Sequence, residues 1–143
     1  MKVALGGDHA GFDYKSSIIE FLESQGVHTY DFGPFSSDSC DYPDFVHPVA
    51  KFIENGECDL GIIICGSGNG VAMTVNKHQS IRCALAWDTE LAKLARFHND
   101  ANIVSIPARY VSIEKAKEIV SAFLGSKFEG GRHQNRISKI PCA

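Results

Sequence analysis

The chain has 143 residues, of which 44% are hydrophobic and 22% are charged, and its formal net charge is −3. A chain of this length and composition is expected to form one domain over residues 1–143, with a core large enough for independent stability. A net charge so close to zero excludes the strongly basic field that is typical of proteins that bind nucleic acids or anionic membranes. No nucleic-acid or membrane partner is therefore expected.

The first residues, MKVALGGDHAG, contain an apolar stretch that is too short for a signal-peptide core or a membrane span. A cytoplasmic location is therefore expected. The cysteines form no C-x-x-C pair and no zinc-finger spacing, which argues against a disulfide framework or a structural metal. Reduced thiols are predicted at all five positions, Cys40, Cys58, Cys65, Cys83 and Cys142.

Short apolar runs alternate with helical patterns along the chain. The predicted strands span residues 2–7, 27–33, 59–65, 81–87 and 101–108, and the predicted helices span residues 12–25, 44–55, 69–77, 88–98 and 113–124. Strands that are apolar throughout and separated by helices indicate a parallel sheet covered on both faces. The expected fold is α/β, a doubly wound, Rossmann-like sheet of five parallel strands between helices. Residues 125–143 are expected to form an appended helical arm.

In open parallel sheets, ligands bind beyond the carboxyl ends of the strands, near the point where the strand order reverses. Four segments follow predicted strands, and we expect them to converge on one cleft. They are GGDHAG (6–11), CGSGNG (65–70), WD (87–88) and PAR (107–109).

The glycine loop CGSGNG is a candidate anion site. Gly66, Gly68 and Gly70 permit left-handed backbone conformations that turn N–H groups inward, and the next helix adds its positive end. The same glycines also suit a tight turn without a ligand. Val71 follows the last glycine, where a P-loop needs lysine, the dinucleotide fingerprint needs a third glycine, and a cysteine-dependent phosphatase needs arginine.

Two of these segments also carry groups that can act on protons. Cys65 ends a strand in an amide-rich loop, which can stabilise a thiolate as a base or nucleophile. It can equally be a buried small hydrophobic residue, the role we expect for Cys58 and Cys83. Asp8 and His9 place a carboxylate beside an imidazole that can donate to an anion, although an ordinary turn with a capping aspartate fits them as well.

Further candidates lie later in the chain. His98 and Asn99 end the predicted helix 88–98, where a histidine also complements the helix dipole. Arg132 and Arg136 are one helical turn apart, so they would project from one face as a paired phosphate grip or remain solvated.

A second interpretation is a non-catalytic nucleotide-binding module of the same fold class. In that module the glycine loop would bind phosphate and Asp88 would bind a ribose. This interpretation leaves Cys65, His98 and the paired arginines without a function.

Six motifs together identify a family resemblance: GGDHAGF (6–12), DYPD (41–44), IICGSGNG (63–70), NK (76–77), HNDAN (98–102) and EGGRHQNR (129–136). Over essentially its whole length the chain resembles the type B ribose-5-phosphate isomerases, whose wider family includes galactose- and allose-6-phosphate isomerases. The resemblance implies conversion of ribose 5-phosphate to ribulose 5-phosphate in the pentose phosphate pathway, or use of a six-carbon sugar phosphate. It implies no metal and no cofactor.

The resemblance also implies residue roles. Cys65 is the base that moves a proton between carbons 2 and 1, and Ser67 assists proton transfer at the sugar oxygens. Some relatives place a glutamate base where this chain has Val71. Asp8 and His98 are implied in ring opening, and the phosphate-binding set is His9, Arg132 and Arg136, with Arg109 as a further candidate. The remaining implied substrate contacts are Gly66, Gly68, Asn69, Gly70 and Asn99.

Members of the resembled family are homodimers, often paired into tetramers. Their sites lie at the subunit interface, and the resemblance implies that His98, Asn99 and Arg109 come from the neighbouring chain.

Overall fold

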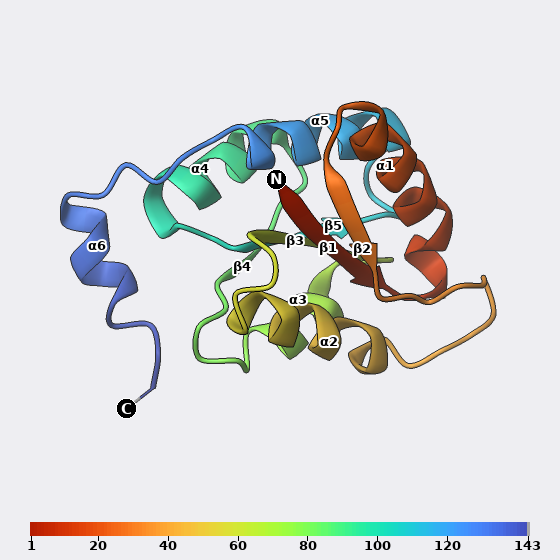
Figure 1. The fold of residues 1–143 in the computed structure, drawn as a ribbon, viewed down its shortest axis with the longest axis horizontal. Helices are drawn as coiled ribbons and strands as arrows, with labels where there is room; N and C mark the ends of the chain where they lie inside the picture. Colours follow the sequence, from red (N-terminus) through yellow and green to blue (C-terminus); the bar gives the residue numbers. More distant parts are fainter. Residues whose placement is uncertain (143) are drawn as a thin grey trace.

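The computed structural model describes residues 1–142, which form a parallel sheet with helices on both faces (Figure 1). The sheet has five strands in the order β2-β1-β3-β5-β4, and every pairing is parallel. The strands are β1 (Lys2–Gly7), β2 (His28–Asp31), β3 (Leu60–Cys65), β4 (Cys83–Leu85) and β5 (Ile103–Pro107). The predicted doubly wound α/β fold is confirmed.

Two layers of helices cover the sheet. In Figure 1, one face carries α1 (Phe12–Ser24), α4 (Thr89–Asn99) and α5 (Ile113–Leu124), and the other carries α2 (Pro43–Glu54) and α3 (Asn69–Val75). A short 3-10 turn, η1 (His9–Gly11), connects β1 to α1. All five predicted helices are present, with boundaries within two residues of those expected.

The alternation of side chains along the strands divides the core in two. In β3, Ile62 and Ile64 pack with the cluster under α1, α4 and α5, whereas Ile63 and Cys65 pack with the cluster under α2 and α3. All residues of β3 are buried, as expected for a central strand with helices on both sides. This register turns the side chain of Cys65 toward α2 and α3.

Strand β4 is shorter than the predicted strand 81–87. It lies at the edge of the sheet and pairs only with β5. Side-chain oxygens accept the backbone N–H groups at its start: the Arg82 N–H donates to Asn102 Oδ1 at 2.8 Å, and the Cys83 N–H donates to Asn76 Oδ1 at 2.8 Å. The edge position therefore limits β4 to three residues.

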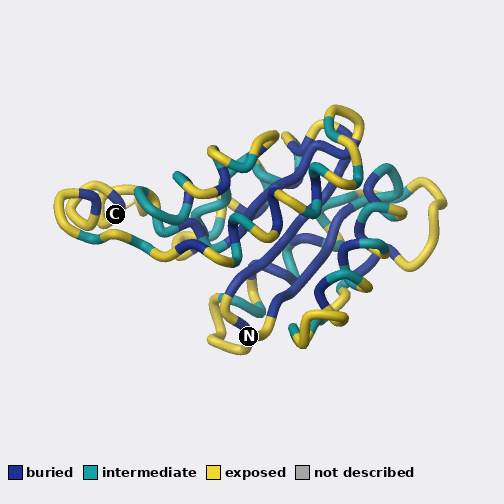
Figure 2. The backbone as a smooth tube through the Cα atoms, turned by 90° about the horizontal axis from the view of Figure 1, so that it is seen from above, coloured by how far each residue is buried: buried dark blue, intermediate teal, exposed yellow. Residues whose placement is uncertain are grey.

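Residues 125–142 form an arm, as predicted, but only Arg132–Ile137 of it are helical, as α6. Ala143 lies outside the described residues. The arm projects from the body beyond α4, and much of it is exposed (Figure 2). The Glu129 N–H donates to the carbonyl of Phe97 at 3.1 Å and ties the arm to the end of α4.

A search of the described residues for a helix both long and apolar enough to cross a bilayer found none.

Candidate active site

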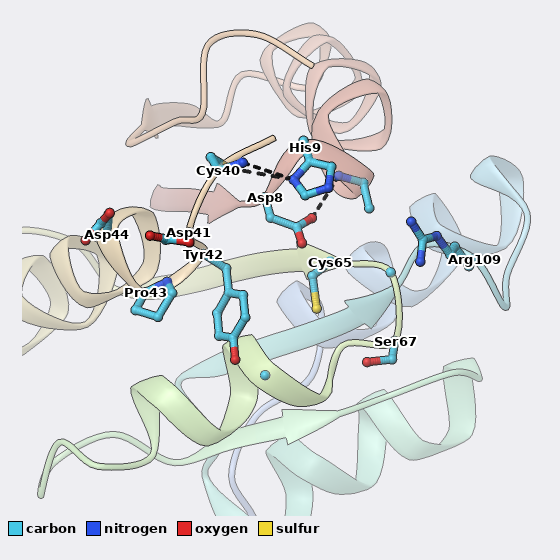
Figure 3. Close-up of a pocket in the computed structure, with 13 residues that line it drawn as sticks. Asp8, His9, Cys40, Asp41, Tyr42, Pro43, Asp44, Cys65, Ser67 and Arg109 are labelled. Atoms are coloured by element: carbon cyan, nitrogen blue, oxygen red, sulfur yellow. Dashed lines mark hydrogen bonds between the residues drawn. The ribbon is translucent and has the colours of Figure 1, made fainter. Parts of the chain in front are cut away.

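A pocket of about 810 Å³ lies at the carboxyl ends of β1 and β3, between which the strand order reverses (Figure 3). This is the position expected for a ligand site in a doubly wound sheet. Its lining residues come from the ends of three strands and from the start of α2. They are Asp8, His9, Ala10, Cys40, Asp41, Tyr42, Pro43, Asp44, Cys65, Gly66, Ser67, Gly70 and Arg109.

Cys65 ends β3 at the floor of this pocket, and only 5% of it is exposed. Its sulfur accepts a hydrogen bond from the N–H of Gly68 at 3.1 Å. Gly68 has φ = +76°, a left-handed conformation that glycine adopts without strain, and this conformation turns its N–H back toward the sulfur. The glycine loop therefore places a backbone N–H donor directly on the sulfur of Cys65.

Ser67 is exposed on the pocket side of the same loop. Its Oγ accepts a hydrogen bond from the N–H of Asn69 at 3.2 Å, so the hydroxyl proton remains available for a ligand.

Asp8 and His9 lie on the opposite wall, on the loop after β1 (Figure 3). Oδ1 of Asp8 accepts from the N–H groups of Ala10 at 2.9 Å and Gly11 at 3.2 Å, so it does cap the turn. The carboxylate still lines the pocket, so capping and ligand contact are compatible. The Cys40 N–H donates to His9 Nδ1 at 3.3 Å, which assigns the ring proton of a neutral His9 to Nε2.

Arg109 enters the pocket from the segment after β5 of the same chain. The expectation that Arg109 comes from a neighbouring chain is therefore corrected. A hydrogen bond within the chain explains the position of Arg109. The Arg109 N–H donates to the carbonyl of Gly66 at 3.0 Å, which joins the segments that follow β5 and β3. Among residues 1–142, no ion pair engages the exposed Arg109 guanidinium.

Sequence reasoning missed one wall of the pocket. It consists of Cys40, Asp41, Tyr42, Pro43 and Asp44, at the end of the long polar loop and the start of α2. The motif DYPD is part of the family resemblance, but none of its residues was predicted to line the site. The tight approach of Tyr42 to Gly70, where an added Cβ would come within 2.5 Å of the ring, depends on tertiary packing between α2 and α3.

Three predicted contacts fall outside the pocket lining. Gly68 is buried behind the loop beside Leu85, and Asn69 faces a separate depression that includes Met73. Asp88 accepts the N–H of Thr89 at 2.7 Å as the N-cap of α4, since β4 lies at the sheet edge, away from the reversal point. The WD segment therefore does not join the cleft, and the nucleotide-binding interpretation loses its ribose-binding acid.

Four other predicted site residues, His98, Asn99, Arg132 and Arg136, lie at the opposite end of the sheet. Helices in strand–helix–strand units run back against the strands, so the end of α4 lies far from the strand ends that form the pocket (Figure 1). Arg132 and Arg136 are both exposed on α6, as their spacing predicted. None of the four lines the pocket of its own chain.

His133 is a neighbour of this group that sequence reasoning missed. It is buried, and its ring stacks on that of His98 with a centroid distance of 4.3 Å and an interplanar angle of 15°. Burial, together with the charges of His98 and Arg132, holds the pKa of the His133 imidazole below its ordinary value.

Of the two cysteines expected to be buried, Cys58 is buried and Cys83 is half-buried. Burial raises the pKa of the Cys58 thiol to about 11 and also raises that of Cys83. Neither lines the pocket, and both stay protonated at neutral pH.

The fold and the pocket define a doubly wound α/β protein whose candidate ligand site combines a cysteine, a glycine loop, a histidine and an arginine. The family model for Ribose/Galactose Isomerase matches residues 3–140, and the chain belongs to that family.

Individual relatives agree with this assignment. Ribose-5-phosphate isomerase B of Escherichia coli K12 is 43% identical over 139 residues, which cover 97% of this chain and 93% of the relative. The structure of Clostridium thermocellum ribose-5-phosphate isomerase B superposes with a TM-score of 0.97 at 43% identity, covering 98% of this chain and 95% of that one.

A Mycoplasma genitalium ribose-5-phosphate isomerase B, solved with bound ribulose 5-phosphate, gives a TM-score of 0.92 at 42% identity. The match covers 97% of this chain and 93% of that one.

Proposed function

We propose that this chain is a single-domain isomerase that interconverts ribose 5-phosphate and ribulose 5-phosphate, with Cys65 as the base. The observation that carries the proposal is the thiol at the end of β3. Its sulfur accepts the Gly68 N–H at 3.1 Å, in a pocket shared with Asp8, His9 and Arg109. Membership of the isomerase family and the named activity of the relatives support the same reaction.

The reaction begins once the sugar ring is open. The Cys65 thiolate takes the proton from carbon 2 of the aldose, and the electron pair of that C–H bond forms the enediolate, whose charge moves onto the oxygen of carbon 1. A proton passes from the oxygen of carbon 2 to that of carbon 1, a transfer that Ser67 can assist. The Cys65 thiol then returns its proton to carbon 1, which leaves a ketone at carbon 2.

The glycine loop and Asp8 support this chemistry in different ways. Loop N–H groups at fixed positions stabilise the developing oxyanion without reorganisation. The Asp8 carboxylate is held by two backbone N–H groups and serves as the base for ring opening, together with His98 as acid.

The phosphate lies at the arginine side of the pocket. His9 donates through Nε2 and Arg109 contributes its exposed guanidinium. These groups bind a part of the substrate that does not react, so they hold the sugar carbons over Cys65.

The site is completed by a second copy of the chain. His98, Asn99, Arg132 and Arg136 cannot reach the pocket of their own chain, because α4 and α6 lie at the other end of the sheet. In a homodimer these four residues enter the pocket of the partner, and dimers can pair further into tetramers. The cytoplasm suits the enzyme, because a reducing compartment keeps the catalytic thiol free.

The activity is tested by ketose formation from ribose 5-phosphate in the presence of a chelator, with allose 6-phosphate and galactose 6-phosphate alongside. Turnover of ribose 5-phosphate at the highest kcat/KM supports the proposal. Preference for a six-carbon sugar phosphate reassigns the substrate, and no turnover on any of the three refutes the function.

Mixing two inactive variants tests the shared site. A Cys65→Ala chain and an Arg136→Ala chain, co-refolded in equal amounts, form mixed dimers in half of all pairings, and each mixed dimer has one intact site. Recovery of about a quarter of wild-type activity is expected for a closed two-fold dimer. Absence of recovery, when mixed dimers are shown to form, contradicts a site built from two chains.

A further inference from the structure

Three side chains that can bind a metal lie together where the arm meets α4. His98, Glu129 and His133 each offer one ligand atom, and these atoms all lie within 4.8 Å of one another. Within residues 1–142 this is the one group of three or more such side chains. It lies at the end of the sheet opposite to the pocket of its own chain.

Backbone contacts bring these side chains together. The Glu129 N–H donates to the carbonyl of Phe97 at 3.1 Å, which places Glu129 beside the last turn of α4, where His98 lies. His133 is the second residue of α6, which follows two glycines with positive φ, and it is 8% exposed. The buried His133 is therefore the fixed member, and the exposed Glu129 and half-buried His98 can adjust toward it.

Two imidazoles and one carboxylate form a known donor set for Zn²⁺, which then keeps a fourth position open for water. Bonds of about 2.0–2.2 Å place the donor atoms of a tetrahedral site roughly 3.4 Å apart. The ligand atoms, now within 4.8 Å of one another, must therefore move closer on binding, through rotation of the half-buried His98 out of the ring stack and a rotamer change of Glu129. The same donors also suit Co²⁺, Ni²⁺ and Cu²⁺.

Local charge sets the strength of such a site. The Glu129 carboxylate offsets one positive charge of the ion, whereas Arg132 and Arg136 on the same short helix oppose a cation. Both arginines are exposed, so solvent and salt screen their repulsion. Binding is therefore expected to be weaker than at a structural zinc site and reversible by a chelator.

We propose that His98, Glu129 and His133 bind a divalent transition metal such as Zn²⁺, and that the bound metal inhibits the isomerase. Inhibition follows because the nitrogen of His98 that binds the metal is no longer available for ring opening in the pocket of the partner. The binding half of this inference stands on the cluster alone, and the inhibitory half rests on the proposed function.

Binding is measured directly on the chelator-treated full chain. Zn²⁺ is titrated by calorimetry and Co²⁺ by its visible absorption, in wild type and in three variants. Glu129→Gln removes the charged ligand, and His133→Phe keeps a stacking ring but removes its nitrogens. Glu20→Gln makes the same charge change at an exposed position on α1 and is the matched control.

One metal ion per chain is expected for wild type and Glu20→Gln. Affinity should fall by at least about tenfold in Glu129→Gln and His133→Phe, since even the loss of a group that only supports a ligand costs about 10- to 100-fold in metal affinity. Equal affinities in all four proteins overturn the site. A site that is lost in Cys65→Ala and kept in Glu129→Gln is a thiol site in the pocket, and this result also overturns it.

Inhibition is measured by ketose formation from ribose 5-phosphate against increasing Zn²⁺. Glu129→Gln should keep the metal-free rate and need at least about tenfold more Zn²⁺ for half inhibition, and a chelator should restore the wild-type rate. Active wild type that binds Zn²⁺ at this cluster without inhibition refutes the inhibitory half. Metal binding with no turnover even in chelator refutes the proposed function and leaves the binding result intact.

Discussion

Gly68 connects Cys65, the proposed base, to α3, and replacement of Gly68 by alanine should damage both stability and turnover. An L-residue at φ = +76° costs about 1–2 kcal/mol. An added Cβ would also collide with the side chain of Leu85 and come within 3.1 Å of Ser105 Oγ and 3.3 Å of the Pro107 nitrogen. Ser105 cannot move freely, because its hydroxyl donates to the carbonyl of Gly68 at 2.7 Å. Crowding of this kind adds about 1–3 kcal/mol.

Gly56→Ala is the matched control for the cost of the left-handed backbone conformation. Gly56 has φ = +75°, and nothing lies within 4 Å of an added Cβ. This variant should therefore lose only the stability that an L-residue costs in a left-handed backbone conformation, about 1–2 kcal/mol. Gly68→Ala should lose about 2–5 kcal/mol in total. The difference between the two variants measures the crowding around Gly68.

Urea denaturation measures both losses, and the kcat of the folded fraction measures the catalytic effect. A shift of the loop by about 1 Å would displace the Gly68 N–H from Cys65 and lower kcat by roughly 100-fold. Gly56→Ala should keep its kcat. Equal stability losses in the two variants, with kcat unchanged in Gly68→Ala, would refute the reasoning about this loop.

Two further predictions concern phosphate binding by Arg109 and the hydrogen-bonded carboxylate of Glu54 at the end of α2. Arg109→Met should raise KM for ribose 5-phosphate about 10- to 100-fold, the equivalent of a charged hydrogen bond, and an unchanged KM would exclude Arg109 from substrate binding. The Glu54 carboxylate accepts hydrogen bonds from Ser80 and His78, which hold its pKa below the ordinary value. A lowered pKa stabilises the fold above the unfolded-state value, so the stability advantage of wild type over Glu54→Gln should be full above about pH 5 and shrink below it. Urea denaturation at pH 7 and pH 4 measures this advantage, and an equal advantage at both values would contradict it.

The strand pattern of the sequence was sufficient for the fold class. Ile62, Ile63 and Ile64 are apolar without alternation because helices cover both faces of β3, and that rule requires no knowledge of tertiary contacts. The extent of β4 was not predictable in the same way. Asn76 and Asn102 satisfy the backbone near its start, and these contacts connect residues 7 and 20 positions apart.

The residues of the candidate site also differ in whether the sequence alone predicts their positions. Cys65, Asp8 and Arg109 lie at or just after the carboxyl ends of strands, where ligands bind in parallel sheets, so the sequence was sufficient to predict that they line one pocket. Tyr42 packs against Gly70 of the glycine loop because α2 packs against α3, and His133 stacks on His98 because the arm folds back onto α4. Neither contact has a local signal in the sequence. The roles proposed for His98 and Arg136 further require a second chain.

The most direct test of the central claim is the kcat of Cys65→Ala on ribose 5-phosphate, measured in chelator with the urea unfolding curve as the check on folding. A positioned general base contributes about 10²–10⁴-fold, so kcat should fall by at least about 100-fold while KM changes little. A folded Cys65→Ala chain that keeps the wild-type kcat would show that another group moves the proton.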